Sequence, residues 1–307
     1  MSRLTAIVVT YNSQDTIIAC LTSLKEYLPE ESKIVVVDNS SSDKTVDLVR
    51  QFVSEMGLND FVLHSLSENL GFGAGNNYAM KRHPSEYYYL HNGDAYLQSK
   101  TTLQDALDLF AKEQNIGIIG LPLVFPDGSV QNAAYSFMSM RKMGLQVLHV
   151  HTLARALINI PSLEIVLRPL SRFSIARSFI DQQLGREDNC THQYYDWVCG
   201  AALLLHESVY QATGGFDERI FLYGEDELLA YRSQEKGFKT AQVHTDAVIH
   251  DFGWGKHKKK NSVVQKLKYE GLSHVINCYY PQSDSYSRVK RKLMKLLTKY
   301  HIRMGVT

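Results

Sequence analysis

Residues 4–40 read LTAIVVTYNSQDTIIACLTSLKEYLPEESKIVVVDNS. Two short, β-branched apolar runs, Leu4–Thr10 and Lys33–Asp38, flank a segment from Gln14 to Tyr27 whose apolar residues recur with helical spacing. The Asn12-Ser13 pair in front of that segment predicts its N-terminal cap. A continuous apolar run is typical of a strand buried on both faces, as in a parallel sheet covered by helices. The stretch therefore predicts a strand–helix–strand unit.

The same alternation continues to about residue 120. We expect further strands at Phe61–Leu66 and Glu86–His91, and helices at Thr45–Met56 and Phe72–Arg82. Strands that alternate with helices predict an α/β fold with a mainly parallel, Rossmann-like sheet flanked by helices. Ligands bind such sheets at the carboxyl ends of the strands. We therefore expect residues 1–120 to form an α/β half that binds a ligand at this edge.

The pattern changes in the following residues, 121–255, which we expect to form a second half. Residues 137–180 are apolar and basic, and prolines interrupt them, which predicts an inserted helical segment. This insertion is a candidate for contact with a substrate, a membrane or a second copy of the chain. The remaining elements expected in this half are Trp197–Leu205, Thr240–His244 and Ala247–His250 as strands, and Glu225–Lys236 as a helix.

Composition sets the class of protein. The chain has 307 residues, and 44% of them are apolar, which is typical of a folded globular protein. Its four cysteines form no CxxC pair, which favours reduced thiols in a cytoplasmic protein. We find neither a signal-peptide pattern at the N-terminus nor an apolar run long enough to span a bilayer.

The net charge of +1 conceals a strong asymmetry. Residues 256–307 hold 13 Lys and Arg against two acids, whereas the preceding residues have a net charge of −10. Within this basic tail, one helical face is apolar, and it comprises Val289, Leu293, Leu296, Leu297, Tyr300 and Met304. A basic amphipathic helix suits an anionic membrane surface. The alternative is a helix that packs this face on the domain, and nucleic acid is disfavoured because aromatic residues do not alternate with the basic ones.

Polar residues follow the predicted strands, and each has two interpretations. Asp38 either binds a base or ribose or only caps a turn. The glycine-rich stretch 69–77 allows close backbone approach and opens a helix, whose N-terminus favours phosphate. Asn92-Gly93-Asp94 is a plain turn or offers one carboxylate to a divalent ion on a diphosphate. His250, at the end of a strand, is either structural or a ligand of the same ion.

An acidic segment lies later in the chain. Residues 214–218 read GGFDE, and residues 221–227 read FLYGEDE. A carboxylate with apolar neighbours has a raised pKa and can act as a general base. Alternatively, Glu225, Asp226 and Glu227 only complement the dipole of a helix N-terminus.

Seven motifs, in order along residues 4–255, together resemble glycosyltransferase family 2, and most of all its bacterial rhamnosyltransferase-like branch. They are Thr10-Tyr11-Asn12, Val37–Asp43, Asn69-Leu70-Gly71-Phe72, Asn92-Gly93-Asp94, Gly214–Glu218, Tyr223-Gly224-Glu225-Asp226 and His250. Each motif is weak by itself, and the set in this order is specific.

The resemblance implies an A-type glycosyltransferase fold, with a nucleotide-sugar-binding half at residues 1–120 and an acceptor-binding, catalytic half at residues 121–255. The insertion at residues 137–180 would then be a candidate for contact with the acceptor. The resemblance also implies an inverting transfer from a nucleoside-diphosphate sugar, with Mn²⁺ or Mg²⁺ as cofactor. The implied acceptor is an oligosaccharide or a lipid-linked glycan of bacterial surface-polysaccharide synthesis, and rhamnose is the first expectation for the donor sugar. Such a protein would be cytoplasmic and peripheral at the inner face of the cell membrane, and a homo-oligomer is possible.

Residue roles are implied by position in the matched motifs. Asp226 matches the catalytic base, with Glu225 beside it. Asp94 matches the last acid of the family's Asp-x-Asp metal motif, and His250 matches a late histidine that helps to hold metal or diphosphate. The implied donor-binding residues are Thr10, Tyr11, Asn12, Asp38, Asn69, Gly71, Asn77, Asn92 and Asp94.

The chain departs from the family pattern at two positions. Asn92 replaces the first acid of Asp-x-Asp, and Leu228 stands where many relatives carry an acid, so that Glu227 is the nearest substitute. Two other functions remain open. A sugar nucleotidyltransferase would need a glycine-rich phosphate loop, which residues 10–13 do not resemble, and a non-catalytic nucleotide-sugar-binding scaffold is suggested by Asn92.

Overall fold

The computed structural model describes residues 2–57, 60–139, 190–251, 262–280 and 285–304. The chain forms two compact units, of which the first comprises Met1–Phe137 with Thr191–Tyr279, and the second Met138–Cys190 with Tyr280–Thr307. From residue 140 onward, the predicted insertion lies outside the described residues. The first unit contains every candidate site residue.

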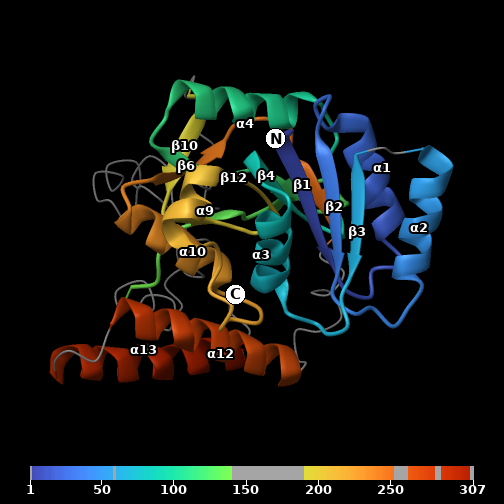
Figure 1. The fold of residues 1–307 in the computed structure, drawn as a ribbon. Coiled ribbons are helices and arrows are strands. Elements are labelled where there is room, and N and C mark those ends of the chain that lie inside the picture. The colour runs from blue at the N-terminus through green and yellow to red at the C-terminus, as the bar shows by residue number, and fades with distance from the viewer. Residues whose placement is uncertain (1, 58–59, 140–189, 252–261, 281–284, 305–307) are drawn as a thin grey trace, which may run out of the picture. The chain divides into compact units, whose positions relative to one another are not determined.

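An eight-stranded sheet forms the centre of the first unit (Figure 1). Strands β3, β2, β1 and β4 run parallel to one another, as the predicted strand–helix–strand units require. Strand β12 is antiparallel to both of its neighbours, so the sheet as a whole is mixed. In spatial order the strands are β10 (His192–Tyr195), β13 (Lys239–Val243), β6 (Ile116–Gly120), β12 (Ala202–His206), β4 (Ser85–Asn92), β1 (Ser2–Thr10), β2 (Lys33–Asp38) and β3 (Phe61–Ser65).

Helices cover both faces of this sheet (Figure 1). Side chains alternate along β1, so that Leu4, Ala6 and Val8 join one hydrophobic cluster and Ile7 joins the other. The first cluster takes in α1 (Ile17–Tyr27), α2 (Thr45–Met56) and α4 (Thr101–Lys112), and the second takes in α3 (Phe72–Arg82), α9 (Glu207–Thr213) and α10 (Glu225–Glu235). This layering explains why the strands are apolar on both faces.

Two small sheets bring distant segments together. In the four-stranded sheet, β14 pairs with β5, which places His250 opposite Ala95. In the two-stranded sheet, β11 pairs with β9, which places Trp197 opposite Tyr135. The strands of these sheets are β5 (Ala95–Tyr96), β14 (Val248–His250), β7 (Leu123–Val124) and β8 (Val130–Gln131), and β11 (Trp197–Val198) and β9 (Ala134–Tyr135).

Two local predictions were wrong. The strand expected at Trp197–Leu205 is two strands, β11 and β12, because the chain turns at Gly200 and passes from one sheet to another. The Asn12-Ser13 pair does not cap α1, which begins at Ile17. Instead, Oδ1 of Asn12 accepts a hydrogen bond from the N–H of Ser42, so this side chain ties together the loops that follow β1 and β2.

The C-terminal residues form two helices in different units. Helix α12 (Ser262–Tyr279) belongs to the first unit and contacts α10. Helix α13 (Ser285–Met304) belongs to the second unit, where Met294, Thr298 and Ile302 are buried. None of the helices in the described ranges is both long enough and apolar enough to cross a bilayer.

Candidate active site

The carboxyl ends of β1 and β2 meet in register, with Thr10 beside Asp38. One carboxylate oxygen of Asp38, Oδ2, accepts a hydrogen bond of 3.0 Å from the N–H of Ser41 and so caps the turn. The other oxygen, Oδ1, and the hydroxyl of Thr10 are both buried, and neither has a hydrogen-bond partner within the described residues. A buried polar atom without a partner is costly, so these two atoms are candidates for contact with a ligand.

Tyr11 and Asn12 follow β1 at the same edge. The ring of Tyr11 is 42% exposed, and an exposed ring can stack on a nucleotide base. Asn12 adopts a left-handed conformation, with a φ of 51°, and its N–H donates a 2.8 Å hydrogen bond to the hydroxyl of Ser41. Because both the backbone and the side chain of Asn12 bind the loop after β2, this residue fixes the loops at this edge of the sheet.

The glycine-rich turn before α3 approaches protein backbone. Gly71 has a φ of 87°, and a Cβ atom at this position would overlap the carbonyl oxygen of Phe221. Oδ1 of Asn69 accepts a 2.9 Å hydrogen bond from the N–H of Gly71, and Nδ2 of Asn39 donates one of 3.0 Å to its carbonyl. The glycine therefore allows the turn to pack against the loop that precedes Glu225.

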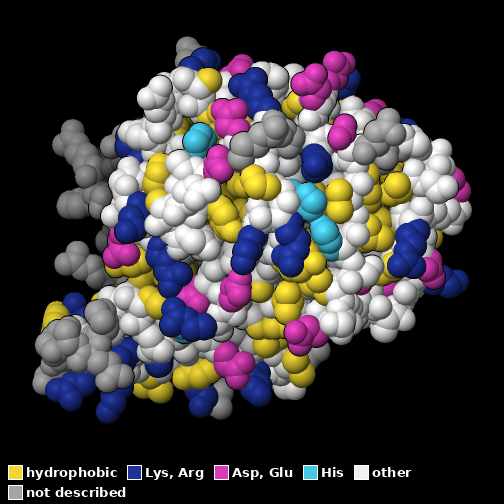
Figure 2. Space-filling view, in the orientation of Figure 1, with side chains coloured by type: hydrophobic (Ala, Val, Ile, Leu, Met, Phe, Trp, Pro, Cys, Tyr) yellow, Lys and Arg dark blue, Asp and Glu magenta, His cyan; other side chains and the backbone are white. Residues whose placement is uncertain are grey.

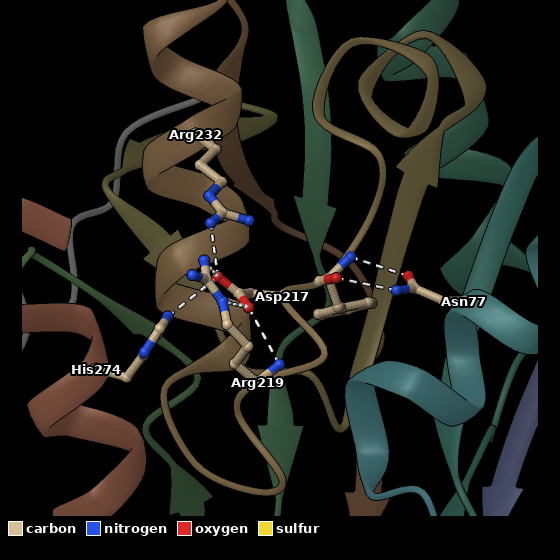
Figure 3. Close-up of polar contacts among 6 residues, drawn as sticks. Asn77, Asp217, Arg219, Arg232 and His274 are labelled. Carbon is tan, nitrogen blue, oxygen red and sulfur yellow. Dashed lines mark hydrogen bonds and ion pairs between the residues drawn. The ribbon is translucent and has the colours of Figure 1, made fainter. Parts of the chain in front are cut away.

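Asn77 links α3 to the GGFDE segment (Figure 3). Its side-chain amide donates a hydrogen bond of 2.9 Å to the carbonyl of Phe216 and accepts one of 2.9 Å from the N–H of the same residue. The amide also donates to Oε1 of Glu218 at 3.0 Å. These bonds engage both the oxygen and the nitrogen of the Asn77 amide. Asn77 therefore contributes to the site by holding the GGFDE segment in place.

Asn92, Asp94 and His250 come together from distant parts of the chain. Nε2 of His250 lies 3.4 Å from Oδ1 of Asp94 and 3.4 Å from the side-chain nitrogen of Asn92. Its Nδ1 lies 3.1 Å from Oε1 of Gln131, and the ring is almost fully buried. A carboxylate and an imidazole with a second partner on its other nitrogen form a donor set that suits a divalent transition ion such as Mn²⁺. The residues therefore fit the implied metal.

Glu225 and Asp226 open α10, where backbone donors favour negative charge. Oδ1 of Asp226 accepts a 2.9 Å hydrogen bond from the N–H of Glu227, and Oδ2 accepts one of 3.2 Å from the N–H of Gly200. Glu225 is buried, and its Oε2 has no hydrogen-bond partner among the residues that the structure describes. Burial raises the pKa of both side chains, and the charge of Asp226 raises the pKa of Glu225 further, while backbone N–H donors oppose the shift of each.

The balance between burial and hydrogen bonding decides which of the two carboxyl groups, Glu225 or Asp226, holds a proton. Backbone N–H groups stabilise a carboxylate only in its ionised form, and Asp226 has two such donors. Glu225 is the more buried of the two residues and is the one with an unpartnered oxygen. At neutral pH, Asp226 therefore carries the negative charge and Glu225 holds a proton. A half-buried, ionised carboxylate with a raised pKa is chemically able to accept a proton.

Asp217 anchors the loop that leads to this pair (Figure 3). Arg219 binds it through Nε at 2.8 Å and Nη2 at 2.6 Å, Arg232 binds Oδ2 at 2.6 Å, and Nε2 of His274 lies 3.1 Å from the same oxygen. Burial by itself would raise the pKa of Asp217, but these donors hold it well below its usual range. Asp217 is thus a permanent anion at the centre of a cationic cluster.

The ligand atoms of Asp217, His274 and Cys278 lie within 4.8 Å of one another. Such a group can hold a metal ion in principle. Here two guanidinium groups already bind the carboxylate, and they would repel a cation. We therefore assign no metal to this group.

The family model described as Glycosyl transferase family 2 matches residues 5–169, which is more than half of the chain. The chain belongs to glycosyl transferase family 2. This membership confirms the resemblance that the motifs indicated.

Curated relatives in this family include proteins of bacterial surface-polymer synthesis. The O-antigen biosynthesis protein RfbC of Myxococcus xanthus is 24% identical over 72% of this chain and 15% of its own length. The poly(ribitol-phosphate) β-N-acetylglucosaminyltransferase TarS of Staphylococcus aureus is 35% identical over 34% of this chain and 18% of its own length. The chain thus spans less than a fifth of the length of either relative. An N-acetylglucosaminyl-diphospho-decaprenol L-rhamnosyltransferase of Mycobacterium tuberculosis is 39% identical over 18% of each chain.

Solved structures share the fold over nearly the whole chain. The mannosyltransferase PcManGT of Pyrobaculum calidifontis, in complex with GDP-Man and Mn²⁺, has a TM-score of 0.59 at 16% identity and covers 99% of this chain and 73% of its own. TarS residues 1–349 with UDP-GlcNAc have a TM-score of 0.58 at 16% identity, with the same coverage of both chains. The predicted A-type glycosyltransferase fold is confirmed.

Three elements of the site were not predicted from the sequence. Gly200 holds Asp226, but it lay inside a predicted strand. The partners of Asp217 are separated from it by up to 57 residues, so spacing could not reveal them. The contact of Glu227, the nearest substitute for the acid missing at position 228, was also not predicted: this side chain is buried and accepts a 2.8 Å hydrogen bond from the hydroxyl of Tyr279.

Proposed function

We propose that this glycosyltransferase is an inverting enzyme in which Asp226 is the general base. The observation that supports this role is the half-buried carboxylate of Asp226, held by the N–H groups of Gly200 and Glu227 beside a more deeply buried Glu225. Glu225 keeps its proton and thereby avoids a second buried charge. This arrangement leaves Asp226 ionised and ready to accept a proton from substrate.

The reaction follows from that role. Asp226 removes the proton from an acceptor hydroxyl while the oxygen of that hydroxyl forms a bond to the anomeric carbon of the donor sugar. The bond between that carbon and the nucleoside diphosphate breaks on the opposite face, so the diphosphate leaves with its electron pair and the configuration inverts. General base assistance of this kind contributes about 10²–10⁴-fold to the rate.

The donor is a nucleoside-diphosphate sugar. The unpartnered Thr10 hydroxyl and Asp38 Oδ1 would bind the base or ribose, and Tyr11 would stack on the base. Asn12, Asn69, Gly71 and Asn77 would shape this half of the site through the backbone contacts that they make. Because these residues already form hydrogen bonds within the protein, we expect them to support donor binding indirectly, by fixing the loops around the donor.

Asp94 and His250 would hold Mn²⁺ or Mg²⁺, with Asn92 beside them. Such an ion, when bound, supplies positive charge that stabilises a leaving diphosphate. The structure of PcManGT with Mn²⁺, which shares this fold, supports a divalent ion. The imidazole in the donor set favours Mn²⁺ over Mg²⁺.

The acceptor we propose is a growing glycan of a bacterial surface polysaccharide, and the donor sugar is rhamnose or another hexose. The printed names of the relatives support this class, since they include an O-antigen biosynthesis protein and a rhamnosyltransferase that acts on N-acetylglucosaminyl-diphospho-decaprenol. A lipid-linked acceptor would require the enzyme to work at a membrane.

Helix α13 is the element that we propose for membrane contact. One face of this helix carries exposed apolar residues, each with between 42% and 68% of its surface accessible to solvent: Tyr286, Val289, Leu293, Leu296 and Tyr300. Exposed basic residues flank this face, and Figure 2 shows Lys and Arg side chains gathered along α13. The predicted apolar face is thus divided, with Leu297 half-buried and Leu293 exposed. Apolar and basic side chains exposed together suit a peripheral site on an anionic cytoplasmic leaflet.

A binding experiment tests the donor class. Thermal unfolding is measured with dTDP-rhamnose, UDP-galactose, UDP-glucose and UDP-N-acetylglucosamine, each with and without Mn²⁺. A ligand at 100 times its Kd stabilises the fold by about 2.7 kcal/mol, which is a shift of several degrees. We expect one donor to give a metal-dependent shift. If no nucleotide sugar shifts the transition, the proposed donor class is wrong.

A further inference from the structure

Helix α12 lies against the turn that carries the proposed base. Four of its residues contact this turn or the segments on either side of it, and we call them the α12 contact face: Gly271, and His274, Val275 and Tyr279, which follow it by three, four and eight positions. Residues with this spacing share one side of a helix. The contact is therefore a continuous strip about two turns long.

The first contact is a close approach of backbones. A Cβ atom at Gly271 would overlap the carbonyl oxygen of Tyr223, so only glycine permits α12 to lie this near the turn. Tyr223 itself is held in the left-handed region, with a φ of 72°, and Gly224 follows with a φ of 99°. A Cβ atom at Gly224 would in turn lie 3.0 Å from Val275. The helix thus confines the two residues that immediately precede Glu225.

The second contact is polar. Nε2 of His274 donates to Oδ2 of Asp217 at 3.1 Å, and Arg219 and Arg232 bind the same carboxylate (Figure 3). Arg232 lies on α10, the helix that begins with Glu225. Asp217 therefore joins three elements, which are its own loop, α10 and α12. Because its side chain is only 4% exposed, water does not compete for these bonds.

The third contact reaches the carboxylates. The hydroxyl of Tyr279 donates a 2.8 Å hydrogen bond to Oε1 of Glu227, whose N–H holds Oδ1 of Asp226. The ring of Tyr279 packs on Tyr231, with centroids 4.5 Å apart, and on Phe137, at 5.8 Å. Burial, and then the charge of Glu227, raises the pKa of Tyr279, so the hydroxyl stays protonated and remains a donor.

We propose that His274 and Tyr279 are positioning residues for glycosyl transfer, acting through Asp217 and Glu227 to fix the turn that presents Asp226. This inference rests on the proposed role of Asp226. Neither side chain contacts the proposed base directly. Tyr279 holds Glu227, whose N–H binds Asp226, and His274 holds Asp217, which also binds Arg232 on α10. A displacement of about 1 Å in a reacting group costs as much as about 10²-fold in rate, so loosening either contact lowers kcat.

The test compares Tyr279→Phe with Tyr269→Phe, which makes the same chemical change on the same helix away from the contact face. Tyr279→Phe keeps the ring and removes only the hydroxyl. We expect kcat to fall about tenfold or more, with the donor Kd unchanged. We also expect the acid limb of the kcat profile to move to higher pH, because a displaced Glu227 N–H no longer stabilises the ionised form of Asp226. A loss of fold alone would lower the active fraction and would leave the pH profile in place.

His274 gives an independent variant. His274→Ala removes the donor to Asp217, whereas His274→Gln retains an N–H that can reach it, so we expect a larger loss of kcat for alanine than for glutamine. A kcat for Tyr279→Phe equal to that of Tyr269→Phe, together with equal values for the two His274 variants, would overturn this proposal alone. Failure of the wild-type protein to transfer from any nucleotide sugar would instead overturn the proposed function on which it rests.

Discussion

The backbone N–H of Gly200 donates a hydrogen bond of 3.2 Å to Oδ2 of Asp226. Gly200 forms the turn between β11 and β12, so the framework of the sheets holds one oxygen of the proposed base. The N–H of Glu227 holds the other oxygen. Since backbone donors cannot rotate away as side chains do, the orientation of the carboxylate is set before substrate arrives.

Glu225 gives a prediction about stability and pH. Burial, and then the charge of Asp226, raises the pKa of Glu225 above its ordinary value of 4.5. A raised pKa stabilises the fold at low pH, and this contribution is lost as the pH rises from about 4.5 through the raised value. Glu225→Gln does not titrate, so its Tm relative to wild type should increase over that range. The control is Glu30→Gln, at an exposed position. If the Tm difference between Glu225→Gln and wild type stays constant across this pH range, the pKa of Glu225 is not raised by folding.

Gly71 gives a prediction about stability alone. Gly71→Ala places a Cβ atom against the carbonyl of Phe221 and also requires a positive φ, whereas Gly128→Ala requires a positive φ with no atom within 4 Å. Left-handed strain costs roughly 1 kcal/mol, and a backbone overlap adds to it. We expect Gly71→Ala to lower the free energy of unfolding by at least about 2 kcal/mol more than Gly128→Ala, as measured by denaturant titration. Equal losses of unfolding free energy in the two variants would mean that the close approach of Gly71 to Phe221 does not contribute to stability.

Asp94 gives a prediction about the metal. Asp94→Asn removes the charged oxygen from the pair that it forms with His250. We expect the Mn²⁺ concentration for half-maximal activity to rise by at least about tenfold. Asp47→Asn, at an exposed position on α2, is the matched control. An unchanged Mn²⁺ requirement in the Asp94 variant would place the ion elsewhere.

The exposed face of α13 gives a prediction about membranes. Val289→Glu puts a negative charge among apolar side chains and should abolish flotation with anionic vesicles. Val130→Glu, at a residue that is 83% exposed outside α13, should leave flotation unchanged. Raising the salt concentration should weaken wild-type binding, because screening reduces the attraction of the basic residues. Equal flotation of both variants would show that α13 is not the docking face.

The central strands were predictable because β1, β2 and β4 contain short apolar runs rich in β-branched or aromatic residues, which are typical of strands buried on both faces. The break at Gly200 was not predictable, because apolar residues continue on both sides of it. The chain turns there because β11 pairs in one sheet and β12 in another. Asn12 was misassigned as a cap because its actual partner, Ser42, lies 30 residues away.

The same limit applies to the site. Asp226, Asp94 and His250 stand in recognisable motifs and were identified from the sequence as candidates. The contacts of Tyr279 and His274 span 52 and 57 residues and join a segment that carries no motif. Only the tertiary structure brings α12 to the turn, so no local pattern could reveal its part in the site.

The most direct test concerns Asp226. Asp226→Asn keeps the size of the side chain and removes its ability to accept a proton. With the nucleotide sugar that binds wild type, we expect kcat to fall by about 10²–10⁴-fold while the donor Kd stays within about twofold. Glu30→Gln serves as the neutral control. A kcat for Asp226→Asn close to that of wild type would contradict the assignment of the base, and with it the proposed mechanism.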